Sequence, residues 1–101
     1  MSLVRVASIT RLKPNTVMQF EHGETAIAVC NVGGRVHAFL GVCPHQGGPL
    51  GQGNVEDGNL ICPWHGWEYS CATGENDIKP DIKLKRFTVE VKGDEVFVDL
   101  P

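Results

Sequence analysis

Apolar and polar residues alternate with a period of two along much of the chain, which is typical of β-strands with one buried face. The pattern predicts strands at residues 3–9, 16–20, 25–30, 36–40, 87–91 and 96–100. The last two flank the turn Lys92-Gly93-Asp94 and form the clearest hairpin. The turn Asn31-Val32-Gly33-Gly34 separates 25–30 from 36–40. Residues 54–61 predict a turn at 56–58 and a short strand that leads into Cys62.

Helical periodicity is not sustained in any window, so we expect one helical turn at most, at residues 10–13. A chain of 101 residues can bury one modest core. We therefore predict a single all-β domain over residues 1–101, built as a small sandwich of antiparallel strands.

The charge balance argues against several classes of partner. The formal net charge is −3, and the longest basic cluster is 83–86, so we expect no nucleic-acid binding. No stretch approaches the roughly 20 apolar residues needed to cross a bilayer. Residues 1–13 lack the apolar core and cleavage site of a signal peptide. We therefore expect a cytoplasmic protein without a membrane anchor.

Two short motifs carry the chemistry of the chain: Cys43-Pro44-His45 and Cys62-Pro63-Trp64-His65. Sixteen residues separate His45 from Cys62. Two thiolates and two imidazoles from paired loops form the ligand set of a Rieske [2Fe–2S] centre. The motifs therefore indicate electron transfer.

A structural zinc ion is the alternative for the same four side chains. Zinc fingers usually pair two Cys and then two His on one tetrahedral ion. Here each motif contains one Cys and one His, which suits two loops that each contact both irons of a cluster. A zinc-stapled interaction module without redox activity therefore remains the less favoured hypothesis.

Glycines lie beside both motifs, at positions 47, 48, 51, 53 and 66. Without a Cβ atom they let backbone N–H groups approach closely. We expect some of these amides to point at cluster sulfurs, where they would stabilise the added electron.

The segments CPHQGGPLGQG (43–53) and CPWHGWEYSCATGE (62–75) resemble the two cluster-binding loops of the Rieske family. They are most similar to its soluble, low-potential branch, which includes the ferredoxins of aromatic-ring dioxygenases. The resemblance implies one [2Fe–2S] cluster, held by two loops at one end of a Rieske-type antiparallel β-sandwich. It also implies that Cys43 and Cys62 bind one iron and that His45 and His65 bind the other.

The chain departs from the high-potential Rieske pattern at three positions. Gly48 and Trp64 stand where those proteins carry two disulfide-bonded Cys, and Trp67 stands where they carry a Ser that bonds a cluster sulfide. Their Tyr is matched by Tyr69, whose hydroxyl is expected to bond a ligand thiolate. We therefore predict a potential toward the lower part of the Rieske range, which spans about −150 to +300 mV.

The resemblance also implies a set of residues around the cluster. Residues 74–81, with Pro80, resemble the family's third loop, which covers the cluster. The expected cluster neighbours are Gly47, Gly48, Trp64, Gly66, Trp67, Tyr69 and Pro80. Cys30 and Cys71 lie outside the motifs, and we interpret both as core residues.

The predicted role is a one-electron carrier from a flavin-dependent reductase to a terminal oxygenase or another redox protein, acting as a monomer. We expect no catalysis by the chain alone, because an oxygenase needs a further mononuclear iron, for which 101 residues leave no room. The alternative is a small Rieske subunit of a larger oxidoreductase, such as assimilatory nitrite reductase.

Overall fold

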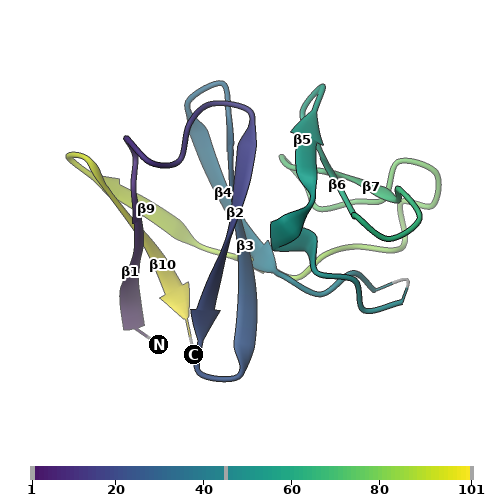
Figure 1. The fold of residues 1–101 in the computed structure, drawn as a ribbon, viewed down its shortest axis with the longest axis horizontal. Coiled ribbons are helices and arrows are strands. Elements are labelled where there is room, and N and C mark those ends of the chain that lie inside the picture. Colours follow the sequence, from purple (N-terminus) through teal and green to yellow (C-terminus); the bar gives the residue numbers. More distant parts are fainter. Residues whose placement is uncertain (1, 45, 101) are drawn as a thin grey trace.

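The computed structural model describes residues 2–44 and 46–100, which form antiparallel strands arranged in three small sheets (Figure 1). The all-β, antiparallel fold predicted from the sequence is confirmed. The elements are β1 (Ser2–Ser8), β2 (Thr16–His22), β3 (Thr25–Val32), β4 (Arg35–Leu40), the 3₁₀ turn η1 (Leu50–Gln52), β5 (Asn54–Glu56), β6 (Asn59–Ile61), β7 (Glu68–Ser70), β8 (Arg86–Phe87), β9 (Val89–Lys92) and β10 (Glu95–Leu100).

Two of the sheets enclose one hydrophobic core. Their strand orders are β1-β10-β9 and β2-β3-β4-β8. Along β10 the residues Val96, Val98 and Leu100 are buried, and they pack with Ile27 and Val29 of β3. The period-2 alternation of β10 therefore has the cause expected from its sequence, because every second side chain faces this core.

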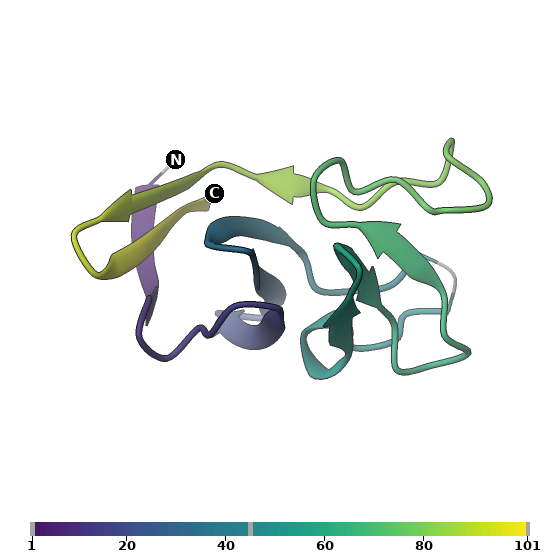
Figure 2. The same ribbon diagram turned by 90° about the horizontal axis from the view of Figure 1, so that it is seen from above.

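The third sheet, β5-β6-β7, packs against the opposite face of the four-stranded sheet (Figures 1 and 2). Ala28, Cys30 and Phe39 contribute to this second core from β3 and β4, and Leu60 and Tyr69 contribute from β6 and β7. Strand β3 is buried on both faces, which explains why its sequence is an unbroken apolar run rather than an alternating one.

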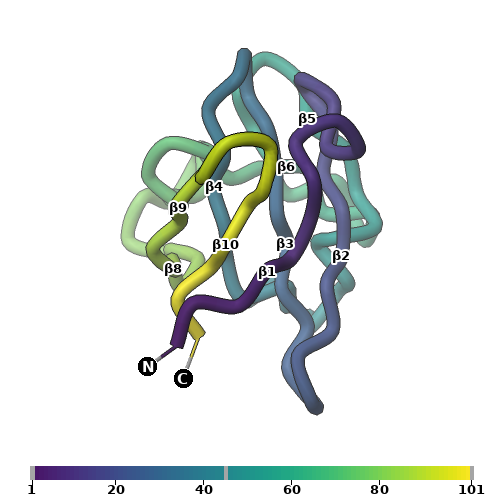
Figure 3. The backbone as a smooth tube through the Cα atoms, turned by 90° about the vertical axis from the view of Figure 1, so that its left-hand side faces the viewer, coloured from purple at the N-terminus to yellow at the C-terminus, as the bar shows by residue number. Residues whose placement is uncertain are grey.

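The strand predicted at residues 87–91 is divided between two sheets. Arg86 and Phe87 pair with β4, and β9 pairs with β10. The chain passes from one sheet to the other at Thr88, whose carbonyl accepts a hydrogen bond from the N–H of Asp99. Figure 3 shows the continuous path from β8 through β9 into β10.

The expectation of one helical turn at most near residues 10–13 agrees with the structure, which has a single turn there and no helix. The N–H groups of Arg11 and Leu12 both bond to the carbonyl of Ser8, which makes an isolated turn. Pro14 follows at once and disfavours helical backbone in the residue before it. Among the described residues, helical structure is confined to the 3₁₀ turn at Leu50–Gln52, and no helix there is long and apolar enough to cross a membrane.

Candidate metal centre

The two motifs lie on loops at the same end of the molecule. The first loop connects β4 to η1, and the second connects β6 to β7. Backbone hydrogen bonds close both loops. The N–H of Cys43 bonds to the carbonyl of Gly48 at 2.9 Å, and the N–H of Cys62 bonds to the carbonyl of Trp67 at 2.8 Å. Each predicted thiol ligand is thus anchored at the base of its loop.

The thiols of Cys43 and Cys62 lie side by side in the core beneath the loops. Each residue is 1% exposed. Burial raises the pKa of the Cys62 thiol, the Trp64 N–H lowers it, and the neighbouring Cys43 thiol raises it, so that the net direction is upward. The Trp64 N–H donates to the Sγ atom of Cys62 at 3.4 Å. Two buried thiols with a backbone donor aimed at one of them form a suitable site for a metal that binds thiolate.

Tyr69, from the middle of β7, reaches the same two thiols. Its hydroxyl lies 3.2 Å from the Sγ atom of Cys43, which confirms the contact expected from the sequence. Burial raises the pKa of Tyr69, and the hydrogen bond to Cys43 raises it further. The hydroxyl therefore stays protonated and can donate to Cys43 whenever that sulfur is a thiolate.

Gly48 is required by the close approach of the two loops. A Cβ atom at this position would lie 2.8 Å from the Sγ atom of Cys62 and 3.0 Å from the Cγ atom of Trp64. Gly53 is required for another reason, because its Cβ atom would lie 1.9 Å from the carbonyl oxygen of Ile61. The first glycine brings the loops together over the thiols, and the second lets the backbone between η1 and β5 lie against β6.

The two predicted imidazole ligands differ in what the structure describes. His65 is exposed in the turn of the second loop, with a φ of 68°. His45 lies outside the described residues, so its predicted role stays a prediction. Within residues 2–44 and 46–100, no three His, Cys, Asp or Glu side chains converge on one point.

The third loop lies beside His65. Asn76, Ile78 and Lys79 line a cavity of about 340 Å³ together with His65 and Trp67. The role predicted for residues 74–81, that of a loop covering the cluster, stays a prediction. Pro80 is exposed, and its predicted role beside the cluster stays a prediction.

Asn76 shapes this loop and was missed in the sequence analysis. Its side chain is buried, donates to the carbonyl of Glu68 at 3.2 Å, and accepts from the N–H groups of Ile78 and Lys79 at 3.0 and 2.9 Å. Asparagine commonly caps a turn in this way, so the run Asn76-Asp77-Ile78-Lys79 carried a usable signal.

The remaining predicted neighbours of the cluster differ in burial. Trp67 is partly buried against the second core, whereas Trp64 is 48% exposed beside His65. Gly47 and Gly66 are exposed in the turns of the two loops, with φ angles of 77° and 72°. Trp67 therefore packs beneath the second loop, and Trp64 stands at its surface.

Cys30 and Cys71 form a second thiol pair in the same core. The Sγ of Cys30 donates to the Sγ of Cys71 at 3.4 Å, and both residues are buried. The hydrogen bond to Cys71 and burial both raise the pKa of the Cys30 thiol. The prediction that these two residues pack in the core is confirmed.

Comparisons with known proteins agree with this geometry. Residues 2–97 match the family described as the Rieske [2Fe-2S] domain. The ferredoxin component of biphenyl 2,3-dioxygenase from Rhodococcus jostii (strain RHA1) is 36% identical over 101 residues, which cover 99% of this chain and 94% of the relative.

Solved structures share the fold. A ferredoxin chain from a complex of reduced oxygenase and oxidized ferredoxin in carbazole 1,9a-dioxygenase superposes with a TM-score of 0.86 at 30% identity. The match covers 95% of this chain and 91% of that one. A nitrite reductase NADPH small subunit superposes with a TM-score of 0.83 at 17% identity, covering 99% of this chain and 100% of that one, a likeness of fold alone.

Proposed function

Because the chain belongs to the Rieske [2Fe-2S] domain family, we propose that it passes single electrons from a flavin-dependent reductase to a terminal oxygenase. The likeness to ferredoxin components over nearly its whole length supports this role. The proposal assigns the chain no bond chemistry of its own. Its contribution is to hold a redox centre and to present that centre to partner proteins.

The observation that carries the proposal is the pair of buried thiols of Cys43 and Cys62 beneath two loops that each also carry an imidazole. We propose Cys43 and Cys62 as ligands of one iron, and His45 and His65 as ligands of the other. The donor set fits the family's [2Fe–2S] cluster, which takes up and releases one electron when bound.

The protein stabilises the centre through donors whose positions are set by the fold. The hydroxyl of Tyr69 and the N–H of Trp64 each lie within hydrogen-bonding distance of a proposed ligand sulfur. Donors of this kind favour the more negative, reduced state. Because Tyr69 is buried in the sheet and Trp64 is fixed by its own loop, neither needs to reorganise when the charge changes.

Exposed apolar side chains at this end of the molecule supply a docking surface. Val42, Trp64 and Ile78 are 44%, 48% and 80% exposed, and they belong to the first, second and third loops. Apolar groups gathered on a surface favour association with another protein. We propose that the reductase and the oxygenase bind this apolar rim in turn, with His65 at the contact.

The test is a reconstituted electron-transfer chain. The holoprotein would replace the natural ferredoxin in a mixture of NADH, a flavin-dependent ferredoxin reductase and the oxygenase component of a biphenyl dioxygenase. Dihydroxylated product would be measured by chromatography, and cytochrome c reduction would be followed in parallel. We expect both activities, and we expect Trp64→Ala and Ile78→Ala to slow product formation. Leu3→Ala is the matched control, because Leu3 is also exposed but lies on β1 at the other end of the molecule.

The two readouts separate the parts of the proposal. Cytochrome c reduction without product would overturn the oxygenase partner and leave the carrier role. The absence of both would overturn the carrier role and favour a subunit that works only inside a larger oxidoreductase. The proposal further places the carrier in the cytoplasm as a monomer, where the thiols of Cys30 and Cys71 would stay reduced.

A further inference from the structure

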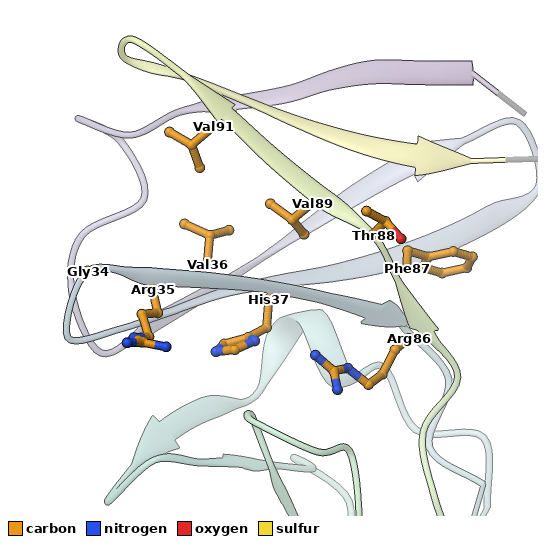
Figure 4. A pocket seen from close by; sticks show the side chains of 9 residues that line it. All are labelled: Gly34, Arg35, Val36, His37, Arg86, Phe87, Thr88, Val89 and Val91. Carbon is orange, nitrogen blue, oxygen red and sulfur yellow. The ribbon is translucent and has the colours of Figure 1, made fainter.

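A cleft opens where β8 and β9 leave β4. Strand β8 pairs with β4 only at Ala38 and Phe39, and the chain then turns away to join β10 as β9. Among the described residues, no strand pairs with the outer edge of β4 between the Gly33–Gly34 turn and His37. The space between this edge and β9 is a cavity of about 680 Å³ (Figure 4).

The two sides of the cleft differ in chemistry. On one side Arg35, His37 and Arg86 project in the same direction from β4 and β8 (Figure 4). On the other side Val36, Val89 and Val91 form an apolar lining, and Phe87 and Thr88 complete the cleft where β8 meets β9. The division follows from strand geometry, because successive side chains on a strand point to opposite faces.

In the part of the chain that the structure describes, no ion pair neutralises the guanidinium groups on the cationic side. The ion pairs formed within residues 2–44 and 46–100 join Arg5 to Glu95 and Lys83 to Glu75, and neither includes Arg35, His37 or Arg86. Burial, Arg86 and Arg35, in that order, lower the pKa of His37, so near neutral pH the positive charge of this side comes from Arg35 and Arg86. Glu90 lies between Val89 and Val91 in sequence, and strand alternation directs it to the opposite face of β9.

We propose that this cleft binds an extended segment of a partner protein in which acidic and apolar residues alternate. The segment adds to the open edge of β4 as a strand. Its acidic side chains meet Arg35 and Arg86 and accept a hydrogen bond from His37, and the intervening apolar side chains meet Val36, Val89 and Val91. Strand addition at an exposed sheet edge is a recurring mode of peptide recognition, in which alternate side chains provide the specificity.

Two observations favour this occupant over a compact anion. The apolar side of the cleft includes Val91, which is 48% exposed and gains nothing from a small polar ligand. The edge of β4 also has the backbone donors and acceptors that an isolated anion would leave unused. The cleft belongs to β4, β8 and β9 and the apolar rim belongs to the three loops, so a segment bound here leaves the rim free for docking.

The test uses a fluorescein-labelled peptide of alternating glutamate and valine, about six residues long, which is a common strand length. Fluorescence anisotropy with the holoprotein would measure its affinity. A peptide with the same composition but with its glutamates in one block, and an alternating lysine and valine peptide, serve as controls. The variant R35E/R86E reverses the cationic side, and R11E/K13E reverses the same number of exposed charges elsewhere.

We expect the alternating acidic peptide to bind the wild type and R11E/K13E, and R35E/R86E to weaken binding by at least about tenfold. We also expect R35E/R86E to bind the alternating lysine peptide in its place, which would show that this variant is folded. No binding of the acidic peptide below about 1 mM would overturn the proposal. Equal binding of the blocked peptide, or equal weakening by R11E/K13E, would also overturn it, because either result would indicate unspecific charge attraction.

Discussion

The hydroxyl of Tyr69 and the sulfur of Cys43 lie 3.2 Å apart, and this contact joins β7 to the first loop. The two residues are 26 positions apart in sequence and belong to different motifs. A buried tyrosine in a small sheet thus fixes the position of a proposed ligand thiol. The same contact connects the fold to the electronic properties of the centre.

Tyr69→Phe should lower the midpoint potential while keeping the cluster. The Tyr69 hydroxyl donates a hydrogen bond that stabilises the reduced state, and phenylalanine cannot donate it. A hydrogen bond worth about 0.5–1.5 kcal/mol corresponds to a decrease of about 20–60 mV for one electron.

The midpoint potential of the wild type should itself lie in the lower part of the Rieske range. A midpoint above roughly +150 mV would contradict the argument from Gly48, Trp64 and Trp67. Spectroelectrochemical titration of both proteins measures the two quantities.

Gly48→Ala should impair assembly of the centre. The new methyl would lie 2.8 Å from the Sγ of Cys62 and 3.0 Å from the Cγ of Trp64, so the second loop must move away. We expect less iron per chain and weaker visible absorbance than in the wild type.

The control for this change is Gly23→Ala in the turn between β2 and β3. Gly23 has a φ of 61°, so alanine there costs about 1 kcal/mol of backbone strain, but no atom lies within 4 Å of the new methyl. Iron content should remain that of the wild type. Equal iron loss in both variants would mean that general instability, rather than crowding at Cys62, explains the result.

Cys71→Ser and Cys43→Ser should distinguish a thiol that packs in the core from a thiol that binds iron. Cys71 packs beside Cys30 in the core, so its replacement should keep the iron and lower the melting temperature by about 5 °C, the effect of burying a hydroxyl. Cys43→Ser should lose the visible absorbance. Retention of the centre in Cys43→Ser, or its loss in Cys71→Ser, would show that the ligand assignment is wrong.

His37 should make stability fall in mild acid. Burial, Arg86 and Arg35 hold its pKa below the ordinary value of 6.5. The unfolded chain therefore binds more protons between the folded pKa and 6.5, and stability decreases as pH falls through this window. Melting temperatures measured across it should depend less on pH in His37→Gln.

Proton NMR of the His37 ring provides the complementary measurement. Arg86→Gln removes a positive charge from its surroundings and should raise the titration midpoint towards 6.5. A midpoint of 6.5 or above in the wild type would contradict the assigned causes.

The strands could be predicted from sequence because their cause is local. Alternation along residues 96–100 and the glycine turn at 33–34 each identify an element without reference to the rest of the chain. Strand β7 escaped prediction because it has only three residues and is stabilised by its pairing with β6. The transfer of the chain between sheets at Thr88 likewise depends on tertiary pairing, which alternation does not report.

The residues of the motifs could be predicted from the sequence, whereas the contacts between the two loops could not. The two motifs identified Cys43 and Cys62, and the resemblance to the Rieske family placed Tyr69 near a thiol. The steric need for Gly48 also involves Trp64, whose position depends on how the two loops meet. The cleft beside β4 could not be foreseen, because it arises where β9 departs, which no local pattern records.

The most direct test of the account is electron paramagnetic resonance of the dithionite-reduced protein, purified without oxygen and analysed for iron and zinc. The account predicts a rhombic signal with the low average g value that mixed His and Cys ligation gives, at two irons per chain. A colourless, silent protein that holds one zinc per chain would contradict it, and would return Cys43, His45, Cys62 and His65 to a structural role.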